Sequence, residues 1–237
     1  MNRKLTAALL IGAAVLTNVA STMLSSIFHY PDVSKQSTDS VLAAFRASQG
    51  PISLWFTVMA FAAALFVPIA IGVGKLSARP VMRIAVVVGI AAAVVQVIGL
   101  MRWPLLVPRH AADAAGTEPG IVATAHDSFD TANLLLGTII GETCGHLLTA
   151  AWTVLVLAAL TRAGAGRWFT ALGMASAVLI TAGVLSPLDL PAVGTANFIG
   201  YALWGLWLIA FAVLLLRQPR TTNTTIRPHR ARHALRA

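Results

Sequence analysis

The sequence predicts an all-α protein, a single integral membrane bundle of six transmembrane helices. Six long apolar runs occupy most of the chain, and an α-helix needs about 20 such residues to cross the hydrocarbon layer. The chain is 57% hydrophobic and only 11% charged, whereas a soluble domain carries about 25% charged residues. The acidic residues also avoid every second connection between the runs. The runs are roughly residues 5–27, 51–74, 84–101, 132–160, 168–187 and 197–216.

The charges of the connections predict the orientation of the bundle. Seven of the eight acidic residues lie in the first, third and fifth connections, and the eighth is Glu142 inside the fourth run. The other connections and both termini carry Lys and Arg without an acidic side chain. Cytoplasmic loops are enriched in Lys and Arg, so we expect both termini in the cytoplasm of a bacterial plasma membrane. The seven residues are Asp32, Asp39, Asp113, Glu118, Asp127, Asp130 and Asp189.

The formal net charge of +9 does not predict a nucleic-acid partner. The positive residues are spread over the inward connections and the tail, so no folded basic face remains. Residues 217–237 are rich in Arg, Thr and His, and we expect them to form a disordered, basic cytoplasmic tail because they lack large apolar side chains. Residues 1–216 are then one domain, surrounded by the lipid bilayer.

The first run is expected to remain as a span and not to be cleaved as a signal peptide. It is longer than the usual apolar region of a signal peptide, and Asn18 is poorly suited to the cleavage site. Asn18, Thr22 and Ser25 recur every three or four residues, so they share one helical face. We expect this stripe to face polar residues of the bundle interior.

The second and third runs each carry one informative residue. Pro68 lies inside the second run and predicts a kink, because proline cannot donate the helical hydrogen bond. Gln96 lies inside the third run and is expected to find a partner across a helix interface. In the connection before the second run, Val41–Phe45 is expected to form a short helix.

Aromatic residues near two run ends predict the outer membrane boundary. Trp and Tyr are enriched where a bilayer meets water. Arg102 and Trp103 follow the third run, and Tyr201 and Trp204 lie near the start of the sixth. We therefore expect these four residues at the outer boundary.

A short amphipathic helix is predicted before the fourth span. Ile121, Val122, Ala125 and Phe129 occur at helical spacing in a connection that otherwise is polar. Such a pattern is typical of a helix that lies along a membrane surface. We expect this helix on the extracytoplasmic side, leading into the fourth span.

The fourth run contains a polar face that is the candidate functional site. At α-helical spacing, Glu142, His146 and Thr149 fall on one face together with Thr138, Gly145 and Thr153. Ionisable residues inside transmembrane segments usually point into the bundle or into a wet cavity. Glu142 and His146 are four residues apart, so their side chains are expected to be neighbours.

Three interpretations of this face remain open. It is a structural polar cluster that keeps the helices in register, or an outward-facing pocket that binds or transports a small molecule or ion. In the second case Asn18 and Gln96 are expected to face Glu142, His146 and Thr149. In the third interpretation Glu142 and His146 form a metal or catalytic site with a further ligand such as His29. The spacing of these residues matches no compact metal motif.

No sequence motif predicts catalysis or a cofactor. The chain has no phosphate-binding glycine loop, no GxSxG or HExxH motif and no CxxCH, and its single cysteine, Cys144, excludes an intramolecular disulfide. We therefore expect no cofactor and favour a non-enzymatic membrane protein with a polar pocket. The alternatives are an intramembrane or metal-dependent enzyme that uses Glu142 and His146, and a structural or accessory subunit of a membrane complex.

Three short segments carry a family resemblance. They are residues 99–104 (GLMRWP), followed by Val107-Pro108, residues 141–147 (GETCGHL), and residues 197–204 (NFIGYALW). These segments resemble an uncharacterised family of bacterial multi-pass membrane proteins, the domain of unknown function DUF4386. The resemblance implies a six-helix inner-membrane protein without an assigned activity, and it adds no catalytic residue.

Reporter fusions test the predicted orientation. Fusions at Ala78 and Gly164 should give a cytoplasmic signal, because basic connections remain inside. Fusions at Asp39, Gly116 and Asp189 should give an extracytoplasmic signal. The measurement is the ratio of alkaline phosphatase activity to fluorescent-protein signal at each position, and an extracytoplasmic signal at Gly164 would contradict the six-span topology.

Overall fold

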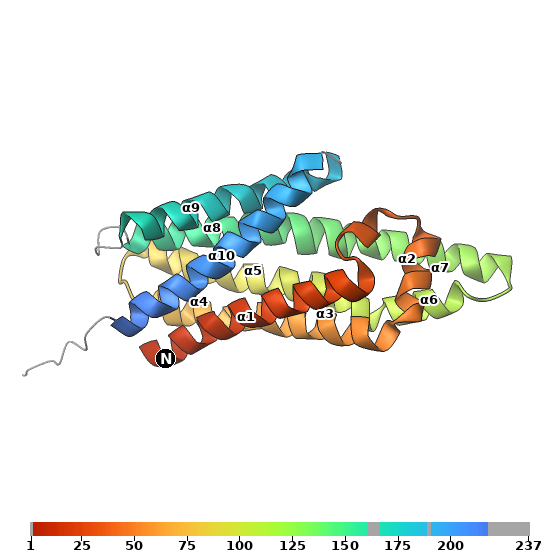
Figure 1. The fold of residues 1–237 in the computed structure, drawn as a ribbon, viewed down its shortest axis with the longest axis horizontal. Helices are drawn as coiled ribbons and strands as arrows, with labels where there is room; N and C mark the ends of the chain where they lie inside the picture. Colours follow the sequence, from red (N-terminus) through yellow and green to blue (C-terminus); the bar gives the residue numbers. More distant parts are fainter. Residues whose placement is uncertain (1, 161–165, 189–190, 218–237) are drawn as a thin grey trace, which may run out of the picture.

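The computed structural model describes residues 2–160, 166–188 and 191–217. Every regular element within these ranges is a helix (Figure 1). The first half contains α1 (Arg3–Phe28), η1 (Asp32–Lys35), α2 (Thr38–Ala47), α3 (Gln49–Ala64), α4 (Phe66–Gly74), α5 (Pro80–Leu105) and α6 (Val107–Asp113). The second half contains α7 (Pro119–Ala132), the π-helix η2 (Asn133–Cys144), α8 (Gly145–Leu160), α9 (Arg167–Ala182), η4 (Gly183–Leu188) and α10 (Pro191–Arg217).

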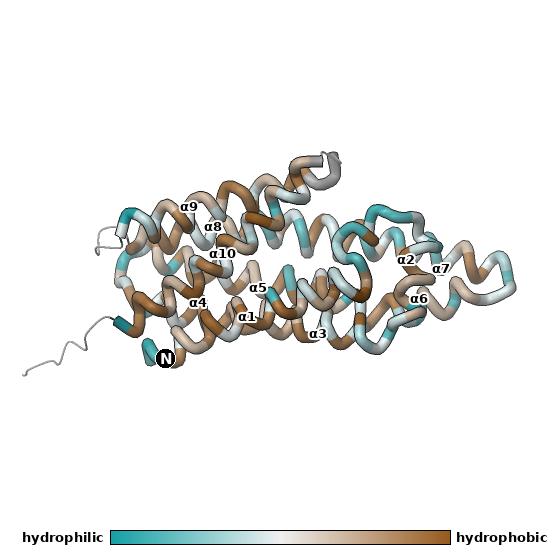
Figure 2. The backbone as a smooth tube through the Cα atoms, in the orientation of Figure 1, coloured by the Kyte–Doolittle hydropathy of each residue, from teal (hydrophilic) through white to brown (hydrophobic). Residues whose placement is uncertain are grey.

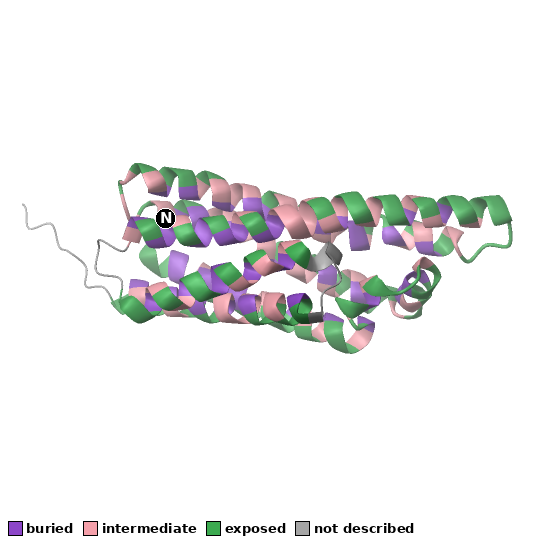
Figure 3. Cartoon of the chain, turned by 90° about the horizontal axis from the view of Figure 1, so that it is seen from above, coloured by how far each residue is buried: buried purple, intermediate pink, exposed green. Residues whose placement is uncertain are grey.

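Six helical segments are long and apolar enough to cross a membrane, which confirms the predicted bundle. They are Arg3–Phe28, Gln49–Gly74, Pro80–Asp113, Pro119–Leu160, Arg167–Leu185 and Ala192–Arg217. Many large apolar side chains on their outer faces are exposed (Figure 3). Phe198 and Val87 retain 70% and 67% of their surface. Soluble monomers rarely expose apolar surface on this scale, so these faces are suited to lipid.

The spans pack in a closed order. α1 packs against both α10 and α3, and α5 packs against α3 and α4 on one side and against η2 and α8 on the other. α9 contacts α8 and α10 and thereby completes the circuit of spans (Figure 1). In this order α5, η2 and α8 form the part of the bundle that carries most of the predicted polar residues.

Hydrophilic residues gather toward the two ends of the bundle (Figure 2). We call the end formed by η1, α2, α6 and α7 the acidic end. It carries Asp32, Asp39, Asp113, Glu118, Asp127 and Asp130. The opposite, basic end carries Arg3, Lys4, Lys75, Arg79, Arg83, Arg167 and Arg217. Which end faces the cytoplasm stays a prediction.

Large aromatic side chains fill the bundle toward the basic end. Trp152 is fully buried and contacts Phe66, with the ring centroids 4.5 Å apart, and Trp207, at 5.8 Å. Phe169 stacks on Trp207 at 5.2 Å. These rings belong to one cluster with apolar residues of α1, α5, α8 and α10, so the core of this half joins spans from both halves of the sequence.

A second cluster of buried side chains closes the acidic end around Trp103. Its ring stacks on Phe56, with centroids 4.8 Å apart, and meets Phe28 edge-on at 5.1 Å. Phe45, on α2, stacks on Trp103 with the ring centroids 6.1 Å apart. Trp103 is fully buried, so its ring faces the bundle interior, and its depth at the outer boundary stays a prediction. The predicted short helix is present as α2, and it covers this cluster.

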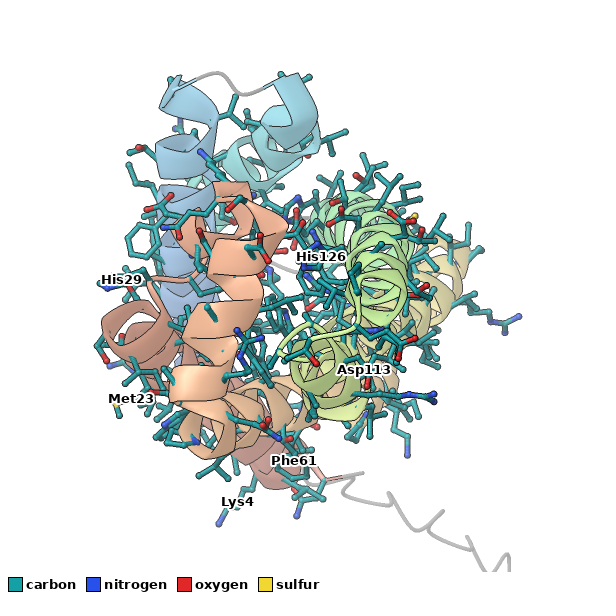
Figure 4. All side chains as sticks on the ribbon, turned by 90° about the vertical axis from the view of Figure 1, so that its right-hand side faces the viewer. Lys4, Met23, His29, Phe61, Asp113 and His126 are labelled. Atoms are coloured by element: carbon teal, nitrogen blue, oxygen red, sulfur yellow. The ribbon has the colours of Figure 1, made fainter. Side chains whose placement is uncertain are left out.

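Polar contacts join α2 to the helices beside it. Thr38 donates a hydrogen bond of 2.6 Å to Asp130, and His126 Nε2 lies 3.0 Å from Asp39. Arg46 donates a 2.8 Å hydrogen bond to the carbonyl oxygen of residue 111 on α6. Figure 4 shows His126 on the side of α7 that faces α2. His126 and Asp130 therefore connect α7 to α2.

Pro68 interrupts the second span, as predicted. α3 ends at Ala64, α4 begins at Phe66, and Leu65 lies between them. Pro68 has no N–H to donate to the carbonyl of Ala64, and its ring crowds that carbonyl. The break four residues before the proline follows directly from this geometry.

The amphipathic helix before the fourth span is present as α7, but it does not lie across the end of the bundle. α7 continues through η2 into α8 as one segment of 42 residues. At 1.5 Å per residue such a segment is about 60 Å long, which is about twice the hydrocarbon thickness. α7 therefore projects beyond the other spans (Figure 1). Its apolar residues Ala125 and Phe129 are buried, and Phe129 belongs to the cluster under α2.

Three predicted features lie outside the described residues. These are the basic tail after Arg217, the inward turn at residues 161–165, and the acidic side chain at position 189. Arg217 itself is the last residue of α10.

The backbones of α5 and η2 make direct contact at a pair of glycines. A Cβ atom added to Gly99 would lie 2.5 Å from the Cα atom of Gly141, and one added to Gly141 would lie 3.0 Å from the Cα atom of Gly99. Small residues permit this approach, and close packing is a main source of helix association in lipid. The contact fixes how α5 and η2 are placed along each other.

The substitution Gly99→Ala should destabilise the protein, because the new methyl group meets backbone that cannot move aside. Overpacking of this kind typically costs about 1–3 kcal/mol. Gly12→Ala is the matched control, since no atom lies within 4 Å of its added Cβ. Alanine favours a helix over glycine by about 1 kcal/mol, so this control should be neutral or slightly stabilising. Thermal unfolding of both variants in detergent checks the difference, and equal behaviour would contradict the contact.

Candidate functional site

Glu142 lies in a π-helical segment and not in the α-helix that the sequence predicted. Residues Asn133–Cys144 form η2, and α-helical geometry resumes at Gly145. π-helices bond residue i to i+5 and are rare, usually short, and frequent at functional sites. The α-helical face drawn through Thr138 and Glu142 is therefore wrong for this stretch. From Gly145 onward the predicted face holds, and His146, Thr149 and Thr153 are buried.

Three glycines allow this segment to pack closely against α5. Gly137, Gly141 and Gly145 are spaced by four residues. An added Cβ would meet the guanidinium of Arg102 at Gly137, the backbone of Gly99 at Gly141, and the side chain of Gln96 at Gly145. The glycine spacing thus makes room for two polar side chains of α5 against the fourth span.

Arg102 is the charged centre of this contact. It is only 6% exposed, so its side chain faces the bundle interior and not the surface of the protein. Its Nη1 donates a 2.6 Å hydrogen bond to the carbonyl oxygen of Gly99, and its Nη2 donates a 3.0 Å bond to Oδ1 of Asn133. Its Cζ lies 5.2 Å from the ring centroid of Trp103, within the range of a cation–π interaction.

Glu142 is the negative charge that balances Arg102. The two side chains attract each other electrostatically. In the described part of the chain, however, no ion pair or hydrogen bond joins them directly. Glu142 is only partly buried. The pair is therefore a separated charge pair across the α5–η2 contact.

Tyr30 completes the surroundings of Arg102 from the connection after α1. Its hydroxyl accepts a hydrogen bond from the Arg102 guanidinium. Burial, with a further contribution from the negative charge of Glu142, raises the pKa of Tyr30 to about 12, against a lowering contribution from Arg102. The hydroxyl is therefore neutral at physiological pH and adds no charge to the site.

His146 has different neighbours from Glu142. It is 8% exposed, and its Nδ1 lies beside Gly183, where an added Cβ would be 2.8 Å from it. Its ring centroid is 5.6 Å from that of Tyr201. Among the described residues no hydrogen bond or ion pair joins His146 to Glu142. The sequence placed the two side chains together as a pair, and the structure gives each a separate set of contacts.

A series of hydroxyl contacts connects α8 to α5 and α10. Gln96 donates a 2.8 Å hydrogen bond to Oγ1 of Thr149, as expected for a buried amide that meets another span. Thr149 is also hydrogen-bonded to the hydroxyl of Tyr201. One turn further, Trp204 donates a 2.9 Å bond to Oγ1 of Thr153. Tyr201 and Trp204 therefore point into the bundle, and their predicted place in an aromatic belt is wrong.

Asn18 does not reach this region. It is exposed on α1, donates a 2.7 Å hydrogen bond to the carbonyl oxygen of Ala14, and lies beside Gly205 of α10. Thr22 donates to the carbonyl oxygen of Asn18. Asn18 and Thr22 thus find hydrogen-bond partners within α1. The expectation that it faces Glu142 and His146 is wrong because α1 packs between α10 and α3, away from η2.

The residues proposed as metal ligands are not brought together. His29 is exposed at the end of α1 and points away from the bundle in Figure 4. Among residues 2–160, 166–188 and 191–217, no three His, Cys, Asp or Glu side chains form a group suited to a metal ion. Glu142 and His146 therefore have no third ligand of these types in the described chain.

Two open depressions of the surface lie away from Glu142 and His146. One, of about 530 Å³, is lined by residues of α7 and η2. The other, of about 250 Å³, lies on α1 at Asn18, Val19, Thr22 and Met23. The outward-facing pocket that the sequence suggested around Glu142 and His146 stays a prediction.

Arg102, Tyr30 and Asn133 are the site residues that sequence reasoning missed. Arg102 follows a long apolar run, so it resembled a boundary residue. The signal against that interpretation is that apolar residues continue beyond it, through Trp103 to Val107. An arginine with apolar sequence on both sides is more consistent with a buried position inside a span.

Arg102 and Glu142 lie at a similar depth. Counted along α5 from Pro80 and along α8 and η2 from Leu160, at 1.5 Å per residue, they are about 33 Å and 27 Å from the basic end. The hydrocarbon layer is about 30 Å thick. If the basic end lies at one boundary, this charge pair lies close to the other, where water and solutes are near.

Replacing Thr149 by valine should lower stability modestly, because Gln96 and Tyr201 lose a shared partner. Hydrogen bonds between spans contribute about 0.6 kcal/mol on average and up to about 1.7 kcal/mol. Thr57→Val is the matched control, since the exposed Thr57 bonds only to a carbonyl of its own helix. Thermal unfolding of purified protein measures both changes, and a loss in the control equal to that in Thr149→Val would refute the interhelical role.

Comparison with known proteins identifies the family. The sequence model of a domain of unknown function, DUF4386, matches residues 5–212, which is most of the chain. No curated protein sequence matches significantly, and no solved structure does. The match runs from the first span into the sixth and includes both Arg102 and Glu142. The chain therefore belongs to the uncharacterised DUF4386 family.

Proposed function

We propose that this protein is a non-enzymatic multi-pass protein of the bacterial plasma membrane that binds a small polar molecule or ion for recognition or transport. The binding site is the centre formed by Arg102 and Glu142, with His146 and Tyr201 one turn deeper. Both termini lie in the cytoplasm, so that the site opens toward the extracytoplasmic side. The orientation is supported by the concentration of acidic side chains at the α7 end of the bundle.

The observation that carries the proposal is the separated charge pair inside two spans. A buried arginine is costly in a membrane span unless it serves a purpose or is fully paired. Arg102 has neutral hydrogen-bond partners only, and its counter-charge Glu142 is not in contact with it. Two charges with a purely structural role would be expected to form a direct ion pair, because their attraction at direct contact offsets most of the cost of desolvating them. The open arrangement leaves both charges able to interact with a ligand.

The surrounding structure is suited to a binding site. The glycine contact holds α5 and η2 in fixed register, and the aromatic cluster around Trp103 supports Arg102 from the acidic end. Preorganised groups bind more strongly because less order is lost on binding. The π-helical segment carries Glu142, and such segments are frequent at functional sites.

A ligand screen by thermal unfolding tests this function. Purified protein in detergent is unfolded in the presence of a panel of small anions, cations, zwitterions and neutral solutes. A ligand at 100 times its Kd should stabilise the protein by about 2.7 kcal/mol, and Arg102→Gln and Glu142→Gln should each change that gain. Arg109→Gln should keep it, because Arg109 is exposed and pairs only with Asp113, at 3.7 Å. A panel without any stabilising member, or equal gains in all variants, would refute the proposed site.

A further inference from the structure

The two charges of the site differ in one chemical respect. A guanidinium remains protonated in proteins, whereas a carboxylate can take up a proton. Arg102 is therefore the permanent charge of the site, 6% exposed and hydrogen-bonded to the neutral oxygens of Gly99, Asn133 and Tyr30. Glu142 is the charge that can be removed.

Building on the binding function proposed above, we infer that the ligand is a small oxyanion held by Arg102, and that Glu142 takes up one proton from water as the anion binds. The planar guanidinium presents its N–H groups as a fork that matches carboxylate, sulfate and phosphate oxygens. A monovalent oxyanion, such as a carboxylate or a phosphodiester, brings in one negative charge and the proton on Glu142 removes one, so the net charge of the site is unchanged. Without the proton, two anions would share one cation where charge is poorly hydrated.

A cationic ligand fits this geometry less well. It would approach Glu142 while the guanidinium of Arg102 remains charged nearby, and no protonation change removes that repulsion. The hydrogen-bond donors of the site point to the same conclusion. Nε1 of Trp103 is buried next to Arg102 in sequence and has no hydrogen-bond partner, and an indole N–H can only donate. Donors and a permanent positive charge favour a ligand that accepts hydrogen bonds.

Glu142 is the titratable group expected to respond at physiological pH. The elements packed against η2 bring few other candidates to it. α5 contributes Arg102, and the connection after α1 contributes Tyr30, which is neutral below a pKa of about 12. α10 contributes the phenol of Tyr201, and α8 contributes His146, which contacts Gly183 and Tyr201. On α7, His126 and Asp130 contact α2, and Asp127 lines an open depression of the surface. The described part of η4 has no ionisable residue.

Two sources can supply such an oxyanion. One is a small anion in solution, and the other is the phosphate of a lipid headgroup, because the site lies near a membrane boundary. The shared chemistry is an oxygen anion that accepts hydrogen bonds from a guanidinium. The experiment therefore needs a soluble arm and a lipid arm.

The test measures anion binding and proton uptake together. Protein in neutral detergent is titrated with sodium acetate in place of sodium chloride at constant ionic strength, and in a second arm with phosphatidylglycerol in mixed micelles. Binding is followed by thermal unfolding between pH 5.5 and pH 8.5, and proton uptake by an indicator dye in weakly buffered solution. We expect uptake of about one proton per anion, and an affinity that falls about tenfold per pH unit where Glu142 is ionised in the free protein. Whichever arm shows both signals identifies the source.

Variants separate the two roles. Arg102→Gln should weaken anion binding about tenfold or more, because a charge-assisted pair is lost. Glu142→Gln should bind the anion with little dependence on pH and without proton uptake. Arg109→Gln should behave like the natural protein. If Arg102→Gln does not fold, Arg102→Lys keeps the charge but not the fork, and it should bind more weakly with the pH dependence intact.

Three outcomes overturn the inference. The first is anion binding that is equally strong at pH 5.5 and pH 8.5 without proton uptake. The second is stabilisation by choline or a neutral solute but by no anion, in which case the proposed binding function stands and only the anion class fails. The third is the absence of stabilisation by any solute in the wider panel, in which case the binding function fails as well.

Discussion

The contact between the backbones of α5 and η2 is the constraint on which the candidate site depends. Lipid offers no hydrophobic driving force between spans, so their association relies on close packing and a few polar contacts. Gly99 and Gly141 provide that packing. The same contact places Arg102 over Gly137 and Gln96 beside Gly145. The position of each polar side chain of α5 relative to the fourth span thus follows from where the glycines meet.

Composition and periodicity were sufficient to predict the architecture. A bilayer requires helices of a certain length with internally bonded backbone, so six apolar runs predict six spans without knowledge of their packing. The break before Pro68 was predictable because proline acts through its own backbone. Gln96 and Thr149 were correctly placed inside the bundle because a polar side chain in an apolar run must find a partner. For the same reason Glu142 could be selected from the sequence as a candidate site residue. The side chains that surround it could not be predicted.

The side chains that surround Glu142 depend on tertiary structure that a single sequence does not specify. Arg102 resembled a boundary residue because an arginine at a run end satisfies the local rules whether it faces water or the bundle. Tyr201 was misplaced for a similar reason, since an aromatic residue near a helix end can face lipid or a partner helix. The π-helical turn at Glu142 rotates everything before Gly145 relative to an α-helical projection. Glu142 and His146 therefore do not form the predicted pair, and each side chain has its own set of contacts.

The position of the charge pair also indicates where pH sensitivity should reside. His126 and Asp39 join α7 to α2, but Asp39 is 79% exposed, and exposed ion pairs contribute only about 0–1 kcal/mol. α2 is held mainly by its buried residues Leu42 and Phe45, each contributing about 1.5–3 kcal/mol. Loss of the contact between His126 and Asp39 therefore leaves α2 in place over the aromatic cluster. Glu142 is different, because its charge is the only one among the described residues that balances the buried Arg102. Neutralising it changes the electrostatic balance of the site itself, and a bound anion is what restores that balance.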